Sequence, residues 1–167
     1  MTRRSVEYYT GWKPGLIGEI ASSHARYYAA EWGFGLPFET KVAGESAAFF
    51  DRLSDSDLAL SAWAGDEFLG SLIIDGNDPS AKPDQSHLRW FIVVDQGRGV
   101  GRALMERAML FVDQAKTQCF LTTFRGLDQA RGLYEKFGFN LTTEIESVTW
   151  GVTVNEQRFD RPARSTL

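Results

Sequence analysis

The sequence predicts an α+β fold in which a mixed central sheet of about seven strands is flanked by about four helices. Two apolar runs are separated only by Gly65-Asp66, which is typical of an antiparallel hairpin. A strand, a glycine-rich turn and a helix follow one another over residues 87–116, and a further apolar run comes next, which indicates a strand–helix–strand unit. A length of 167 residues with 43% hydrophobic content suits one core, so we expect residues 1–167 to form a single domain.

The first half of the chain contains the clearer helical pattern. Residues 15–34 place Leu16, Ile20 and Tyr27 on one apolar face, and Gly33 ends the pattern, so we expect a helix there. The other elements expected in this half are a short strand at 5–10, a helix at 43–53, strands at 57–64 and 67–75, and a polar loop at 76–86.

The second half of the chain places its elements around one glycine-rich turn. Residues 87–94 become apolar on both faces, as expected of a central strand. Residues 100–116 repeat their apolar side chains with a period of about 3.6, which predicts an amphipathic helix. Gly138 lies between two phenylalanines and ends a further helical pattern. The remaining predicted elements are a strand at 119–124, a helix at 127–139, and strands at 140–147 and 152–160.

Composition disfavours several classes of protein. The formal net charge of −4 makes non-specific binding to DNA or RNA a poor expectation, so we predict no nucleic-acid partner. No apolar run approaches the roughly 20 residues of a membrane-spanning helix, so no membrane partner is predicted. The single cysteine, Cys119, lies in a strand pattern, which predicts a buried thiol and a cytoplasmic location. No Cys, His and Asp cluster has metal-ligand spacing, so we predict no metal site.

The glycine-rich turn before helix 100–116 carries the strongest functional signal. The first N–H groups of a helix have no partner within it and are partly positive, and glycines let an anion approach them. We therefore expect a pyrophosphate cradle, with added charge from Arg98 and Arg102. The cradle would consist of Gln96, Gly97, Arg98, Gly99, Val100 and Gly101. The dinucleotide fingerprint G-x-G-x-x-G fails because its third glycine would fall on Arg102 or Leu104, and no Gly-Lys pair completes a phosphate loop.

The spacing Gln96-x-x-Gly99-x-Gly101 resembles the acyl-CoA-binding motif of the GNAT family of N-acetyltransferases. A second segment, "ARGLYEKFGF", is similar to the family's A-x-x-L-Y-x-x-x-G-F pattern, and the order of elements is similar over nearly the whole chain. More narrowly, "EWGF", "HLRWFIV" and "TVNEQRF" resemble the acetyltransferase portion of proteins that also carry a winged-helix regulator domain. The second segment is matched by Ala130, Leu133, Tyr134, Gly138 and Phe139.

This resemblance implies a reaction and roles for particular residues. It implies acetyl-CoA as cofactor and the direct transfer of its acetyl group, in a ternary complex, to a primary amine of a small molecule or a protein. The backbone of Ile92 and Val94 would pair with the pantetheine amides, and an N–H near Val93 would polarise the thioester carbonyl. Tyr134 would donate a proton to the departing thiolate. Asp128 and Ala130 would complete the cofactor contacts.

Two departures from the family pattern support an alternative function. Leu127 stands where the family commonly has an asparagine, so a polar contact to the cofactor is lost or is taken over by Asp128. The stretch Val94-Asp95 is about two residues shorter than the family leads us to expect, which predicts an altered strand bulge there. The alternative is a non-catalytic module that binds or senses acyl-CoA.

A base must also accept a proton from the acceptor amine, whose ordinary pKa is about 10.4. Glu39 is the first candidate, because residues 31–39 are expected to cover the acceptor side. Glu45, Asp75 and His87 are the other candidates, whereas His24 looks structural within its alanine- and serine-rich helix.

Four aromatic residues are candidates for an acceptor pocket, although such clusters more often form a core. They are Trp32, Phe34, Phe38 and Trp90. The last strands of the chain are a common place for subunits to pair in this fold, so a homodimer is a further expectation.

Overall fold

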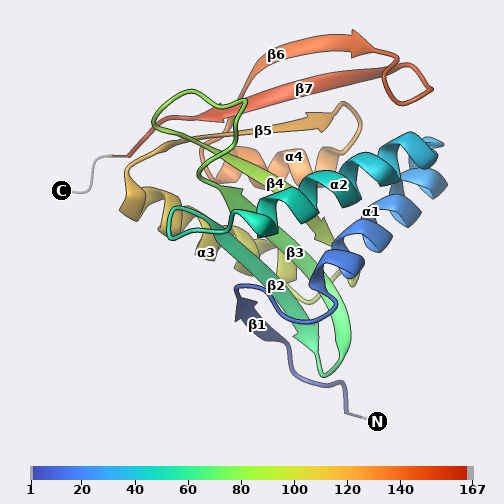
Figure 1. The fold of residues 1–167 in the computed structure, drawn as a ribbon, viewed down its shortest axis with the longest axis vertical. Coiled ribbons are helices and arrows are strands. Elements are labelled where there is room, and N and C mark those ends of the chain that lie inside the picture. Colours follow the sequence, from blue (N-terminus) through green and yellow to red (C-terminus); the bar gives the residue numbers. More distant parts are fainter. Residues whose placement is uncertain (1, 165–167) are drawn as a thin grey trace.

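A computed structural model describes residues 2–164 and shows seven strands and four helices in that range (Figure 1). The helices are α1 (Leu16–Trp32), α2 (Leu36–Asp51), α3 (Val100–Ala115) and α4 (Asp128–Lys136). The strands are β1 (Glu7–Thr10), β2 (Leu58–Ala64), β3 (Glu67–Asp75), β4 (Gln85–Val93), β5 (Gln118–Phe124), β6 (Asn140–Ser147) and β7 (Val154–Arg161).

All seven strands form one mixed sheet in the order β1-β2-β3-β4-β5-β7-β6. Only β4 and β5 pair in parallel, and the other neighbours are antiparallel. The predicted hairpin is confirmed, because Ala64 pairs with Glu67 across the two-residue turn. The α+β prediction, with a mixed sheet of seven strands and four helices, is therefore confirmed.

The helices cover the sheet in two layers. One core cluster joins α3 and α4 to the sheet, and a second joins α1 and α2 to its other face. In Figure 1, α1 and α2 cross in front of the strands and α3 lies behind them. The two layers matter for function because they place different helices on the two sides of the central strands.

The second helix differs most from its prediction. It begins at Leu36 rather than near residue 43, and it continues through Gly44 to Asp51. Proline is compatible with the first turn of a helix, so Pro37 helps to start α2 rather than preventing it. Burial of Phe38 and Phe49 against the sheet then stabilises a longer helix than the local pattern indicates.

The centre of the sheet is opened by an irregular β4. Ser71 pairs with Ile92 and Ile73 pairs with Arg89, so β4 contains one residue more than β3 over this stretch. Trp90 has a φ of 46°, and its carbonyl accepts a hydrogen bond from the buried Ser71 hydroxyl at 2.7 Å. This is a β-bulge, and it lies within β4 rather than after it, where the short 94–95 stretch predicted an altered bulge.

Parallel pairing between β4 and β5 is confined to their first residues. Gln85–His87 pairs with Gln118–Phe120, and no register continues beyond that point. The two strands therefore separate toward their carboxyl ends, and the gap between them forms the candidate active site.

Candidate active site

A cavity of about 1610 Å³ passes through the gap between β4 and β5. Its walls come from both layers of helices, since α1 and α2 line one side and the starts of α3 and α4 line the other. We call these the acceptor side and the cofactor side. Because the strands diverge, one continuous space connects the two faces of the sheet.

The cofactor side contains the predicted glycine turn. Gly97 and Gly99 have φ values of 86° and 73°, which favour glycine, and a Cβ at either position would meet no atom within 4 Å. Gly99 caps α3 without any side-chain hydrogen bond, and the Ala103 N–H donates to the Gly99 carbonyl at 3.1 Å. The N–H groups that precede Ala103 in the first turn of α3 are therefore available to an anion.

Gly101 has a different role from the other two glycines. A Cβ on it would come within 3.4 Å of the Val93 side chain and 3.5 Å of the Phe91 ring. These are ordinary van der Waals distances, so the start of α3 packs against β4 at Gly101.

The two arginines of the turn separate in space. Arg102 is 77% exposed, hydrogen-bonds to Glu106 at 3.0 Å and lines the cavity. Arg98 instead pairs with Asp95 at 3.2 Å and donates to the backbone carbonyl of Arg4, and it does not line the cavity. The prediction that the Arg98 side chain adds charge to the cradle is wrong, because that side chain fastens the turn to the N-terminal segment.

The backbone of β4 is oriented differently from the prediction. The Val94 N–H donates to the Leu69 carbonyl at 2.9 Å, so it is bonded to β3. Antiparallel strands alternate their bonding directions, so Ile92 also bonds toward β3 while Val93 faces the gap. The predicted pairing of a ligand with free backbone at Ile92 and Val94 is therefore corrected, and Val93 is the residue whose amide faces the gap. Its carbonyl accepts a bond from the Gln96 side chain at 3.0 Å.

Tyr134 projects from α4 into the same gap and is only 6% exposed. Its ring packs near Phe91, Phe139 and Phe159, with centroid distances of 6.0, 6.1 and 6.1 Å. No group within residues 2–164 hydrogen-bonds to its hydroxyl, and no fully buried side-chain polar atom there lacks a partner, so the hydroxyl opens to the cavity. Burial, with a smaller effect from the nearby Tyr28 phenol, raises the pKa of Tyr134 and keeps it a neutral donor.

The start of α4 completes the cofactor side. Asp128 and Ala130, for which the resemblance implies cofactor contacts, both line the cavity. Leu127 occupies the N-cap of α4 and also lines the cavity, but it provides no side-chain cap. The N-terminus of α4 is therefore without a polar side chain at the position where the family commonly has one.

The acceptor side is walled by aromatic rings. Phe38 and Trp90 line the cavity as predicted, whereas Trp32 and Phe34 pack behind that surface. Further rings from α1, β5 and the loop after β6 line this side and were not predicted. They are Tyr27, Tyr28, Phe120, Phe124 and Trp150. No local pattern marks these rings, because they become neighbours only when the sheet and helices assemble.

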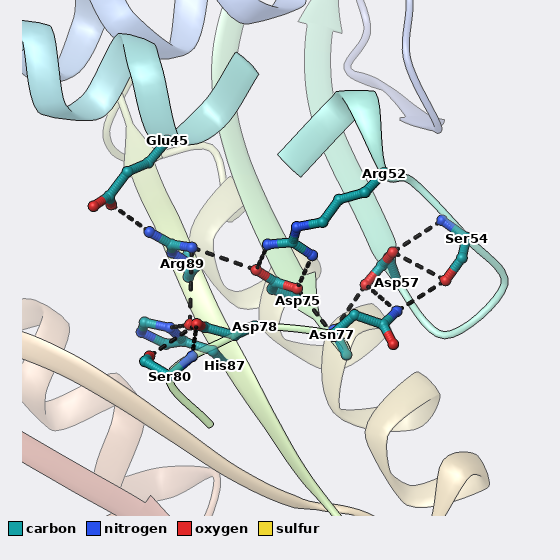
Figure 2. A network of polar contacts seen from close by, with 11 residues as sticks. Glu45, Arg52, Ser54, Asp57, Asp75, Asn77, Asp78, Ser80, His87 and Arg89 are labelled. Carbon is teal, nitrogen blue, oxygen red and sulfur yellow. Dashed lines mark hydrogen bonds and ion pairs between the residues drawn. The ribbon is translucent and has the colours of Figure 1, made fainter. Parts of the chain in front are cut away.

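A network of charged groups closes the far end of the acceptor side (Figure 2). Asp75 is fully buried and accepts two hydrogen bonds from Arg52, at 2.8 and 2.6 Å. Burial alone would raise the pKa of Asp75, but the bonds from Arg52 and the Asn77 amide hold it below its ordinary value. Arg89 joins Asp75 to Glu45. Asp75 is therefore an ionised structural group rather than a base.

The remaining base candidates also have defined surroundings. His87 binds Asp78 through Nδ1 and stacks on Phe120 at 4.3 Å, and burial, partly offset by Asp78, lowers its pKa. Glu45 is paired with Arg89 and with Lys41. Glu39 is exposed on α2 and does not line the cavity, so the structure does not bring it to the other site residues.

The family assignment follows from the sequence that builds this cavity. The profile of the acetyltransferase (GNAT) family matches residues 19–139, which span α1, the glycine turn and α4. The chain belongs to the GNAT acetyltransferase family. A search of curated protein sequences finds no match to this acetyltransferase. The narrower resemblance to winged-helix fusion proteins stays a resemblance, since no comparison extends it.

Solved structures share the fold of this acetyltransferase at low sequence identity. The ribosomal-protein-S18-alanine N-acetyltransferase from Escherichia coli has a TM-score of 0.69 and 16% identity, over 98% of this chain and 97% of that one. A GCN5-related N-acetyltransferase from Kribbella flavida has a TM-score of 0.71 and 16% identity, over 94% and 97%. A GNAT-family acetyltransferase from Streptococcus pneumoniae has a TM-score of 0.67 and 16% identity, over 94% and 99%. These likenesses support the fold.

Two further features of the structure concern membranes and metal ions. Within residues 2–164, no helix is both long and apolar enough to cross a membrane. In the same part of the chain, no group of three or more His, Cys, Asp or Glu side chains is placed to hold a metal ion. Cys119 is buried, as predicted, and burial raises the pKa of its thiol to about 11.

Proposed function

We propose that this acetyltransferase moves the acetyl group of acetyl-CoA directly to a primary amine in a ternary complex. The observation that carries the proposal is the single cavity that joins an anion-binding helix start to an aromatic wall through the gap between β4 and β5. A cofactor can enter from one side and an acceptor from the other, so that the two meet at Val93 and Tyr134.

The cofactor side suits coenzyme A in three places. The N–H groups from Gln96 to Arg102 suit the pyrophosphate, with the Arg102 side chain adding positive charge. Asp128 and Ala130 line the cavity and would lie beside the pantetheine arm. The Val93 amide, which faces the gap, would donate to the thioester carbonyl as negative charge develops on its oxygen.

The chemistry then needs few protein groups. The amine nitrogen bonds to the thioester carbon while the carbon–sulfur bond breaks, and the proton lost by nitrogen is balanced by the one gained at sulfur. Tyr134 would donate a hydrogen bond to the departing thiolate. An ordinary thiol has a pKa of about 8.5, well below that of this tyrosine, so assistance by a hydrogen bond fits better than complete proton transfer.

The acceptor, a small molecule or a protein, would enter along the aromatic wall. Glu39, the first base predicted, remains a weaker proposal than a base on the cavity surface, because its side chain lies outside the cavity. We also propose that residues 1–167 act as a single domain in the cytoplasm. A homodimer through β6 is a further proposal, supported by the exposed Ile145 (66%) on that edge strand.

The first test is thermal unfolding with and without saturating acetyl-CoA. Ligand at about 100 times its dissociation constant should add about 2.7 kcal/mol, or roughly 5–10 °C. Gly99→Asp and Gly99→Asn form a matched pair, since both residues tolerate the left-handed backbone and only Asp adds a negative charge. We expect the rise in unfolding temperature to persist in Gly99→Asn and to vanish in Gly99→Asp. If acetyl-CoA does not raise the unfolding temperature of the parent protein, the proposal is contradicted.

The alternative is an acyl-CoA sensor without turnover, and Leu127 at the start of α4 favours it. A sensor would show the thermal shift yet release no free thiol with any amine. Thiol release measured across a panel of primary amines therefore separates the two functions.

A further inference from the structure

His24 is a buried titratable group in the cavity to which the mechanism above gives no role. It lies on α1, one turn before Tyr28, and is only 5% exposed. Its ring is parallel to that of Tyr28, with centroids 6.4 Å apart and planes 8° apart. Both rings line the acceptor side of the cavity. The sequence predicts a structural role for His24, but a side chain that lines the cavity can also contact a ligand.

The hydrogen bonding of the ring determines which nitrogen carries the proton. Nδ1 lies 2.7 Å from the Ile20 carbonyl oxygen, and a carbonyl can only accept, so Nδ1 must be the donor. In the neutral ring, Nε2 then bears a free lone pair. Burial lowers the pKa of His24 to about 4, partly offset by the bond to Ile20, so the ring is neutral at pH 7.

Nε2 is directed into the cavity. No group in the described part of the chain bonds to it, and no fully buried side-chain nitrogen or oxygen there lacks a partner. Nε2 is therefore not sealed inside the protein, and the space that His24 lines is the cavity. A buried lone pair that faces a ligand space and has no protein partner is suited to accept a hydrogen bond from a ligand.

The same face of α1 borders the gap between β4 and β5. The Tyr28 ring packs against Phe124 of β5, with ring centroids 5.7 Å apart, and both rings line the cavity. On the other side of the gap, Tyr134 packs against Phe91 of β4, two residues before Val93. A ligand nitrogen near the thioester would therefore lie between the α1 face and β4.

We propose that His24 Nε2 accepts a hydrogen bond from the N–H of the acceptor amine and directs the nitrogen lone pair at the thioester carbonyl. The inference rests on the proposed function, since it names the group that holds the nucleophile. The imidazole stays neutral throughout, and the proton that leaves nitrogen is the one balanced at sulfur. His24 thus contacts the substrate and is a catalytic residue.

Two substitutions separate this role from a structural one. His24→Asn keeps a short amide donor for the Ile20 carbonyl but removes the group at the position of Nε2. His24→Gln extends an amide oxygen toward that position. We expect His24→Asn to lower kcat/KM for the amine about tenfold, because one hydrogen bond is lost. We expect His24→Gln to retain most of the wild-type kcat/KM. The acetyl-CoA thermal shift should stay unchanged in both variants. Wild-type kcat/KM in folded His24→Asn, or equal losses in Asn and Gln, would overturn the proposal.

A second measurement does not depend on turnover. The chain has two histidines, so ¹⁵N spectra with a His87→Asn variant assign the His24 nitrogens directly. We expect a protonated Nδ1 and an unprotonated Nε2 at pH 7. The opposite tautomer, or an imidazolium, overturns the role of His24 whatever the enzyme does. Absence of thiol release by the wild type, with the expected tautomer, would instead count against the proposed function.

Discussion

The two sides of the cavity are made from different parts of the polypeptide. The cofactor side uses backbone N–H groups of one contiguous turn, with glycines at 97 and 99 that adopt left-handed φ values. The acceptor side uses side chains from α1, α2, β5 and the loop near Trp150. A site built from backbone depends on local conformation, whereas a site built from side chains depends on how distant elements pack.

The two sides also differ in charge. The cofactor side offers N–H dipoles that do not titrate, while the acceptor side holds the buried His24, the half-buried His87 and a network of paired carboxylates and arginines. Changes in pH and losses of buried charge should therefore act mainly on the acceptor side. Substitutions on each side test this difference.

Removing the charge of Asp75 should be the most damaging single change. Asp75→Asn leaves Arg52 and Arg89 without their buried carboxylate, and breaking such a pair costs about 3–5 kcal/mol. Glu106→Gln on α3 is the control, because Glu106 is 57% exposed, pairs with the 77%-exposed Arg102 and should cost about 1 kcal/mol or less. Urea denaturation measures both, and equal losses would remove the distinction between the two sides.

Acidification should destabilise the acceptor side through His24. The pKa of His24 is about 4 in the folded protein and 6.5 ordinarily, so the unfolded chain binds more protons between these values. The neutral His24 therefore makes its whole contribution to the free energy of unfolding above pH 6.5. That contribution falls by about 3 kcal/mol as the pH drops to 4. Unfolding free energies of the wild type and of His24→Asn should differ in slope over this window, and parallel curves would argue against a buried neutral ring.

Tyr134→Phe tests the boundary between the two sides. The ring packing is kept and the hydroxyl is lost, so we expect kcat to fall about 100-fold, at the lower end for a lost general acid. The acetyl-CoA thermal shift and the unfolding temperature should stay near those of the wild type. Tyr9→Phe, at a tyrosine that is 43% exposed on β1, is the matched control and should leave kcat unchanged. An unchanged kcat in Tyr134→Phe would show that Tyr134 is not the donor to the departing thiolate.

The smallest expected effect concerns the aromatic wall. Trp150→Ala removes a ring that lies 5.4 Å from Phe38 and lines the cavity. Apolar pocket contacts are worth about 1–3 kcal/mol, so the acceptor KM should rise about tenfold while acetyl-CoA affinity is retained. Trp12→Ala, at a tryptophan that is 50% exposed, is the control. A loss of acetyl-CoA affinity in Trp150→Ala would show that the wall does not belong to the acceptor side alone.

Sequence reasoning located the cofactor side more accurately than the acceptor side. The glycine turn and the amphipathic α3 were predicted from spacing within a short segment, and Tyr134 was implied by the family resemblance of the segment that contains it. The errors on that side concern the direction in which a side chain or an N–H group points, since Arg98 turns toward Asp95 and the Val94 N–H donates to Leu69. Neither direction is visible in spacing, because it depends on the partner strand and on the N-terminal segment.

The acceptor side required the tertiary structure. Glu39 looked well placed on residues 31–39, but α2 begins earlier than predicted and leaves that side chain exposed. His24 looked structural in an alanine- and serine-rich helix, yet its Nε2 opens to the cavity. Burial and hydrogen-bond partners decide such roles, and both are properties of the packed chain.

The sequence by itself determined the α+β architecture, the hairpin and the anion-binding turn, because hydrophobic period and glycine φ preferences act over a few residues. Only the tertiary structure decided where β4 bulges, how far β4 and β5 separate, and which rings and charges gather around that gap. Those features arise from contacts between residues distant in the chain, such as Ser71 with Trp90 and Tyr28 with Phe124, which no local pattern specifies.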